Sequence, residues 1–132
     1  MDVFERRAIL QGTDNPGGRV DYVAGLQGEI TLTGFGTRIV VAVRYVPDRY
    51  VVTSASFDAY LKRIEEISWA SLEEAALTVV KDISNEMLTR WAQVNLKAVH
   101  ADLAHVARHD VTVEDRQPGW RNDDLLYRLA PL

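Results

Sequence analysis

Three histidines fall close together in the second half of the chain. His100, His105 and His109 lie within ten residues, and three converging imidazoles could bind zinc. The spacing contains no His-x-His pair, and the hydrophobic alternation puts His100 and His109 on different predicted strands. We therefore expect no metal site. We interpret all three as surface or partly buried histidines that remain candidates for acid–base chemistry.

One glutamate, Glu73, has a more informative position. Ser71 and Glu74 have the Ser-x-x-Glu spacing of a capping box, which predicts that a helix starts here. Glu73 would lie in its first turn, where the helix dipole favours an anionic side chain. A carboxylate held there can accept two N–H donors from a planar heterocycle, such as a guanine-like ring. The alternative is a helix-terminus acid without a ligand.

Several common catalytic arrangements are absent from the sequence. It contains no cysteine, which excludes disulfides, thiolate zinc sites and a cysteine nucleophile. Gly17 and Gly18 precede a predicted strand and not a helix, so they do not form a phosphate-binding loop. No nucleophile-elbow motif supports a Ser-His-Asp triad.

The composition is that of an ordinary globular protein. The 132 residues are 47% hydrophobic and 26% charged, which suits one domain with its own core. The formal charge of −4 argues against a nucleic-acid partner. No apolar run approaches the ~18 residues of a membrane span, and the N-terminus has no apolar signal segment. We expect a cytoplasmic protein with no nucleic-acid or membrane partner.

The first regular elements predicted along the chain are two strands. Residues 11–18 are predicted to form a loop, because Asn, Pro and Gly together favour turns. Apolar and polar residues alternate over 20–33, which is typical of a strand with one buried face. Alternation returns over 37–45 after the tight connection at 34–36, which predicts a hairpin partner. A short extended piece follows at 50–52.

Two helices come next. Apolar residues recur at i, i+3, i+4 and i+7 over 57–64, which predicts a helix with one buried stripe, capped by Ser54 or Ser56. A longer helix is expected over 72–88. Its buried face would contain Leu72, Ala75, Ala76, Val79, Val80, Ile83, Met87 and Leu88.

Two further strands, over 94–98 and 106–114, complete the order β-β-α-α-β-β. This order predicts an α+β fold in which both helices cover one face of an antiparallel four-stranded sheet. We expect a lead-in over 1–18, the domain over 19–115, and a tail over 116–132. The tail is apolar enough to pack on the domain or on a neighbouring subunit.

The segment from Tyr45 to Leu61, Tyr-Val-Pro-Asp-Arg-Tyr-Val-Val-Thr-Ser-Ala-Ser-Phe-Asp-Ala-Tyr-Leu, resembles the 7-cyano-7-deazaguanine reductases. These are tunnelling-fold (T-fold) enzymes, grouped with GTP cyclohydrolase I, that reduce a nitrile with NADPH in queuosine biosynthesis. The resemblance fades outward to about Asn15 and Asp115, and Tyr-Val-Pro-Asp is its most specific part. It implies a T-fold whose subunits form a barrel-shaped homo-oligomer with ligand sites between them. Closing sheet edges into a barrel would also remove unpaired edge strands.

The resemblance carries over to several positions. Glu73 falls where the family has the glutamate that anchors the deazapurine ring. Thr33 and Gly34 match a Thr-Gly just past the catalytic cysteine. Arg108 matches the arginine of a Pro-Arg-Gly-Gly segment whose other three positions are replaced by Ala107, His109 and Asp110.

The departures from the family pattern concern its chemistry. Ile30 occupies the position of the nucleophilic cysteine, Thr37 that of the proton-donating aspartate, and Leu72 that of a histidine beside the anchor. The cofactor signature Glu-Ser-Lys-Ser is reduced to Thr-Ser-Ala-Ser at 53–56. An isoleucine cannot form the thioimide that starts nitrile reduction. The resemblance therefore implies a possible NADPH site with a degraded signature.

We expect a protein that binds a purine-, pterin- or 7-deazaguanine-like heterocycle, with cysteine-free chemistry if it is an enzyme. Glu73 would hold the ring, Arg108 would face an anionic part of the substrate, and Thr33 and Gly34 would line the site. The candidate acid–base groups are Glu29, His100, His105, His109 and Asp110.

Two alternatives stay open. The first is a non-catalytic binding or structural homologue of the same fold, with Trp120, Leu126 and Tyr127 as contact candidates. The second is nitrile reduction by another route, for which we expect no NADPH oxidation.

Overall fold

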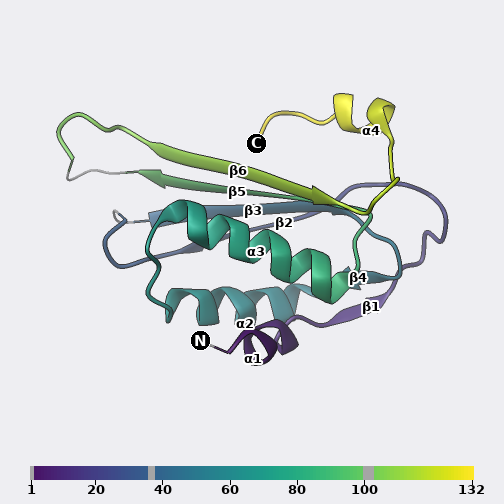
Figure 1. Cartoon of the computed structure of the whole chain (residues 1–132), viewed down its shortest axis with the longest axis horizontal. Helices are drawn as coiled ribbons and strands as arrows, with labels where there is room; N and C mark the ends of the chain where they lie inside the picture. The colour runs from purple at the N-terminus through teal and green to yellow at the C-terminus, as the bar shows by residue number, and fades with distance from the viewer. Residues whose placement is uncertain (1, 36–37, 100–102) are drawn as a thin grey trace.

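A computed structural model describes residues 2–35, 38–99 and 103–132. Its central sheet consists of β2 (Ala24–Ile30), β3 (Arg38–Val46), β5 (Trp91–Val99) and β6 (His109–Arg116). The four strands are antiparallel and lie in the order β2-β3-β5-β6. Helices α2 (Ser54–Glu65) and α3 (Leu72–Met87) cover one face of this sheet (Figure 1). The fold is thus α+β with the predicted sheet. No helix among the described residues is long and apolar enough to cross a membrane.

The strand register puts apolar residues opposite one another on the helix-facing side. Val41 pairs with Leu96, and Val94 pairs with Val113. All four of these positions are buried or partly buried. In β6, Thr112 lies between the partly buried Val111 and Val113 and is exposed. The alternation in the sequence therefore predicted correctly which side of each strand is buried, because side chains of a strand point alternately to its two faces.

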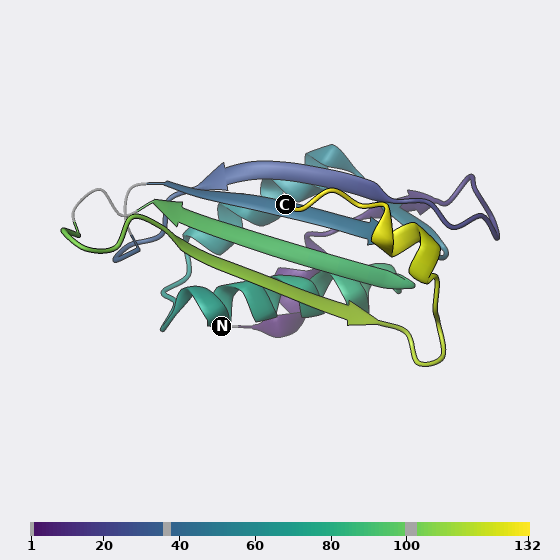
Figure 2. The same ribbon diagram turned by 90° about the horizontal axis from the view of Figure 1, so that it is seen from above.

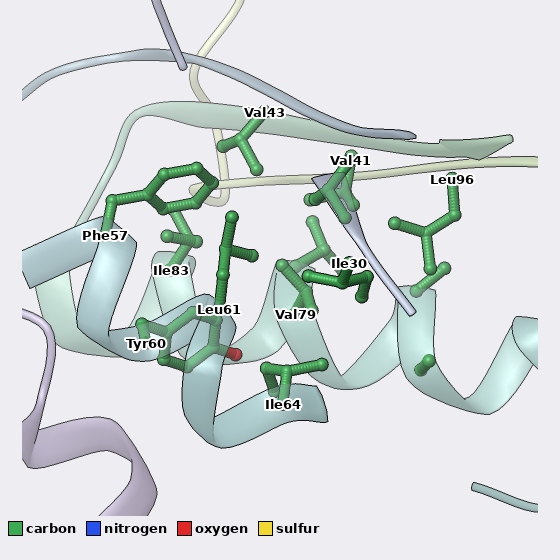
Figure 3. Close-up of a cluster of buried hydrophobic side chains, with 14 of the residues drawn as sticks. Ile30, Val41, Val43, Phe57, Tyr60, Leu61, Ile64, Val79, Ile83 and Leu96 are labelled. Carbon is green, nitrogen blue, oxygen red and sulfur yellow. The ribbon is translucent and has the colours of Figure 1, made fainter. Parts of the chain in front are cut away.

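The core lies between this face of the sheet and the two helices. Phe57 and Leu61 of α2 and Val79 of α3 point towards the sheet, where Val41 and Val43 lie (Figure 3). Each such side chain contributes roughly 1.5–3 kcal/mol when it is fully removed from water. The core therefore fixes both helices against the strands that carry the candidate site residues.

The head of the chain, expected as a lead-in, contains regular structure. Residues 3–8 form helix α1 (Val3–Ala8), and Leu10 joins the hydrophobic core. Within the predicted loop 11–18, β1 (Gly12–Asp14) pairs antiparallel with β4 (Tyr50–Val52). The loop prediction was wrong for these three residues, because their pairing partner lies far away in the sequence.

The helix starts are capped by short polar side chains. Thr53 is the N-cap of α2, and its hydroxyl accepts a hydrogen bond from the backbone N–H of Ser56. The predicted caps, Ser54 and Ser56, were wrong, because both lie inside the first turn. The prediction for α3 is confirmed: the Ser71 hydroxyl accepts from the backbone N–H of Glu74 at 3.1 Å.

The tail crosses the sheet face opposite the helices (Figure 2). It contains α4 (Asp123–Tyr127), preceded by Trp120 and Asn122, whose side chains both donate to Asp21. Near its end, the guanidinium of Arg44 donates to the carbonyl of Ala130 at 2.7 Å. The tail therefore packs on its own domain, as one of the two predicted possibilities.

Candidate functional site

The candidate site starts from the first turn of α3. Ser71 caps this helix, and Leu72 is fully buried beneath it. The next residue, Glu73, points away from the buried stripe, and its side chain remains 49% exposed. A carboxylate in this position lies near the positive end of a helix of 16 residues.

His109 is the side chain that meets this carboxylate. It is the first residue of β6 and pairs with Ala98 of β5, so it lies on the same side of the sheet as Val111. Because α3 packs on β5 and β6, the His109 Nε2 atom comes within 2.6 Å of Glu73 Oε1. The structure thus joins one predicted binding residue to one predicted acid–base candidate.

This contact contributes little to the stability of the fold. The His109 side chain is 39% exposed, and Glu73 is exposed further. Solvent-exposed ion pairs typically contribute about 0–1 kcal/mol. Breaking this contact would therefore leave the hydrophobic core unchanged, and both side chains are accessible from solvent.

Two other candidates lie on the opposite face of the sheet. Glu29 of β2 forms an ion pair with Arg38 at 3.2 Å. Asp110 accepts a hydrogen bond from the Asn95 side chain at 2.6 Å. Because neighbouring residues of a strand face opposite ways, Asp110 points away from the side that His109 shares with Glu73. The structure does not bring Glu29 or Asp110 to Glu73.

Other predicted residues lie in connections at the same end of the molecule as the start of α3 (Figure 1). Thr33 and Gly34 are exposed in the turn after β2, and Gly34 has φ +88°, which glycine adopts without strain. His105 and Arg108 are exposed in the connection between β5 and β6. His100 lies outside the described residues.

A hollow of about 160 Å³ also lies at this end. It lies between the turn after β2 and the α2–α3 connection. Its lining residues are Leu32, Thr33, Glu65, Glu66, Ile67, Ser68 and Trp69, and Glu73 is not one of them. Thr33 is thus beside a concave surface, whereas Glu73 lies on an open part of the protomer.

Two of the positions that depart from the reductase pattern, Ile30 and Leu72, are apolar and buried. Ile30 is 3% exposed and belongs to the core cluster, and Leu72 is fully buried. Neither offers a reactive atom to solvent. Thr37 lies outside the described residues.

The segment Thr53–Ser56 does not fit an NADPH phosphate. Thr53 caps α2, and the Ser56 hydroxyl is buried, where it donates to the carbonyl of Gln11 and accepts from its N–H. Ala55 supplies no cation where the signature has lysine. Thr53 thus stabilises the start of α2, and Ser56 connects this helix to the head of the chain.

A buried polar cluster was missed by the sequence analysis. Asp82 of α3 is fully buried and accepts hydrogen bonds from Arg6 (2.5 and 2.7 Å), Arg7 (2.8 Å) and the Tyr60 hydroxyl (2.5 Å). Burial alone would raise the pKa of Asp82, but the hydrogen bonds from Arg6, Tyr60 and Arg7 outweigh it and hold the pKa below its usual range. The signal was an aspartate inside an apolar helix stripe, between Val80 and Ile83.

Within the described ranges, no group of three or more His, Asp or Glu side chains could hold a metal ion. No protein-family model matches the chain. No curated protein is significantly similar to it.

Proposed function

We propose that this chain is a T-fold protein related to the 7-cyano-7-deazaguanine reductases. It binds a purine-, pterin- or 7-deazaguanine-like heterocycle at a subunit interface, with Glu73 as the anchor. The single observation that carries the proposal is the half-exposed Glu73 carboxylate in the first turn of α3, within 2.6 Å of a side chain from β6.

The fold supports this proposal. The T-fold order β-β-α-α-β-β corresponds to β2, β3, α2, α3, β5 and β6, which form a sequentially ordered antiparallel sheet with both helices on one face. The segment Tyr45–Leu61, which carries the resemblance, connects β3 to α2. In this arrangement the turn after β2, the start of α3 and the start of β6 come together at one end of the protomer (Figure 1).

The chemistry of the anchor also supports it. A carboxylate with two accessible oxygens accepts two parallel N–H donors from an amidine-like ring edge, and such charge-assisted hydrogen bonds are roughly twice as strong as neutral ones. Exposure of Glu73 leaves room for a ring. A second subunit would supply the walls that the open surface lacks.

Two features of the sheet favour assembly into a homo-oligomer. Strands β2 and β6 are at its two edges, and exposed edges of this length invite pairing with another chain. The face opposite the helices is polar, with hydrogen bonds from Arg44 to Gln93 (2.6 Å) and from Asn95 to Thr112 (2.8 Å). The tail covers part of this face, where Arg44 also donates to the carbonyl of Ala130. The uncovered polar part would line the inside of a barrel.

A non-catalytic role is the second candidate. It is favoured by the burial of Ile30, because a core isoleucine in the nucleophile position can neither form a thioimide nor lie against a substrate. Under this reading the protein keeps the ligand anchor and senses or stores the heterocycle. Turnover of any deazapurine or pterin by the purified protein would exclude it.

A thermal-shift screen with guanine, pterin and 7-cyano-7-deazaguanine tests binding. A ligand at about 100 times its Kd adds about 2.7 kcal/mol to the stability of the native state, which raises the Tm by several degrees. We expect such a rise with at least one of these rings for the wild type. Glu73→Ala should abolish it, whereas Glu74→Ala, which removes the neighbouring carboxylate of the same turn, should retain it. No rise with any ring, or an equal rise in Glu73→Ala, would contradict the proposal.

A further inference from the structure

We propose that the chain has a second ligand site, in a hollow between the tail and the sheet, which binds a small organic carboxylate with an apolar body. Arg44 would bind the carboxylate, and the tail would cover the apolar part. This tail hollow lies on the sheet face opposite the helices, whereas Glu73 lies at the start of α3. The inference is therefore independent of the proposed function.

The tail hollow is large enough for a small molecule. It has a volume of about 340 Å³ and lies between β2, β3 and the end of the tail, which crosses this face (Figure 2). Small-molecule sites commonly have volumes of about 300–1,000 Å³. Leu129 and Leu132 of the tail and Val23, just before β2, are among its lining residues. These residues offer apolar surface to a ligand.

Small residues on two neighbouring strands leave this space open. Gly25 pairs with Arg44 and Gln27 pairs with Ala42, so all four lie on the same face of the sheet. A Cβ atom at Gly25 would meet only the Val43 carbonyl, at 3.6 Å, and the Arg44 Cβ, at 3.9 Å. No atom of the tail therefore lies within 4 Å of that position, and the tail does not fill the space above the strands.

Arg44 brings a positive charge to this hollow. Its Nε donates to the side-chain oxygen of Gln93 at 2.6 Å, and its Nη1 donates to the carbonyl of Ala130 at 2.7 Å. Both acceptors are neutral. Among residues 2–35, 38–99 and 103–132, no carboxylate pairs with Arg44, and its Nη2 has no hydrogen-bond partner. The guanidinium, which has five N–H donors, therefore keeps donors for an anion.

Partial burial makes an anion favourable beside Arg44. Burial lowers the pKa of its guanidinium from the ordinary value, because removal from water disfavours the charged form. Arginine nevertheless stays protonated in proteins. A carboxylate beside Nη2 would offset the cost of this partly buried charge, and charge-assisted hydrogen bonds are roughly twice as strong as neutral ones. An anionic group with an apolar body thus matches both parts of the tail hollow.

Titration calorimetry with octanoate tests this site, with octan-1-ol as a probe of the same chain length without the charge. We expect saturable binding of octanoate with one site per protomer. Binding of octan-1-ol should be at least about tenfold weaker, because it lacks hydrogen bonds between charged groups. Arg44→Gln should weaken octanoate binding by a similar factor. Arg38→Gln is the matched control, because Arg38 is on the same strand and pairs with Glu29, and it should bind octanoate like the wild type.

A second variant is needed because Arg44→Gln also removes the hydrogen bond to the tail at Ala130. Ala42→Leu keeps Arg44 and fills the tail hollow, so it should weaken octanoate binding as well. Inorganic phosphate, which is an anion without an apolar body, should bind more weakly than octanoate.

Several results would overturn the site. These are absence of octanoate binding by the wild type, equal binding of octan-1-ol, and undiminished octanoate binding by Arg44→Gln or Ala42→Leu. Phosphate binding as tight as that of octanoate would overturn the assignment of a ligand with an apolar body. None of these results changes the expected binding of a heterocycle at Glu73, so the two proposals fail separately.

Discussion

At the residue scale, Asp82 is a fully buried charged side chain. It forms an ion pair with Arg6, which is 3% exposed. Two guanidinium groups and a tyrosine hydroxyl converge on one carboxylate, so helices α1, α2 and α3 are joined through a single group. Removing one partner of a buried pair leaves the other charge uncompensated.

Asp82→Asn should therefore destabilise the protein strongly. The neutral amide cannot balance Arg6, and breaking a buried pair typically costs about 3–5 kcal/mol. Urea unfolding followed by tryptophan fluorescence measures the loss in free energy of unfolding. Asp123→Asn is the control, because its partner Arg121 is exposed, and it should leave stability nearly unchanged. Equal effects of the two variants would contradict the structural role of Asp82.

The same cluster predicts how stability depends on pH. The pKa of Asp82 is lower in the folded protein than in the unfolded chain, so its contribution is present above about pH 4, the usual range of an aspartate. That contribution is lost as the pH falls through the lower, folded-state pKa. Burial, together with Asp82, raises the pKa of Tyr60 well above its usual value, so its contribution is present below about pH 10 and lost at higher pH.

Urea midpoints measured across this range should fall at both extremes. In Asp82→Asn the acid decline should be shallower than in the wild type, because the titrating carboxyl is gone. An unchanged acid limb in this variant would show that other carboxyl groups control acid stability.

At the element scale, the close packing of α2 on β2 depends on Gly28. A Cβ atom at this position would lie 2.5 Å from Leu61 Cδ1, and Leu61 is buried in the core. On the same strand, a Cβ atom at Gly25 would meet only the Val43 carbonyl, at 3.6 Å, and the Arg44 Cβ, at 3.9 Å. Packing therefore requires a glycine at position 28 but not at position 25.

Gly28→Ala should lower the free energy of unfolding by about 1–3 kcal/mol, because the added methyl group overpacks the core. Gly25→Ala should be neutral or slightly stabilising, because it reduces the freedom of the unfolded chain without a clash. Chemical unfolding of the two variants beside the wild type measures the difference. A larger loss for Gly25→Ala would mean that the register of β2 is different.

The same scale explains what could be predicted from the sequence. Strands β2, β3, β5 and β6 and helices α2 and α3 follow local periodicity, which each segment carries by itself. The pairing of β1 with β4 and the contact of Arg6 with Asp82 depend on segments that are distant in sequence. Local patterns do not encode such contacts, so both were missed.

The sequence predicted which residues belong to the candidate site but not how they are arranged. Glu73 and His109 could each be named from residue type and position. Their contact depends on where β6 starts and how α3 lies across it, and the predicted strand began at Val106, before the observed start at His109. Glu29 and Asp110 are separated from Glu73 because their side chains are on the sheet face opposite the helices, which depends on the strand register.

At the scale of the whole molecule, we predict a homo-oligomer. The edge strands β2 and β6 would pair between protomers, and the open surface around Glu73 would become a cleft. Sedimentation equilibrium at micromolar concentrations should give a mass that is a multiple of the 14.9 kDa chain. A protein that stays monomeric at these concentrations would contradict the interface site, because a single protomer leaves Glu73 on an open surface.

A calorimetric titration of the assembled protein with 7-cyano-7-deazaguanine, guanine and pterin measures directly whether Glu73 anchors a heterocycle. We expect saturable binding of at least one ring with one site per protomer. In Glu73→Ala the affinity should fall at least about tenfold, as expected for the loss of hydrogen bonds to a charged group, whereas Glu74→Ala should retain it. Absence of binding by the wild type, or undiminished binding by Glu73→Ala, would contradict the role of Glu73 as the ligand anchor.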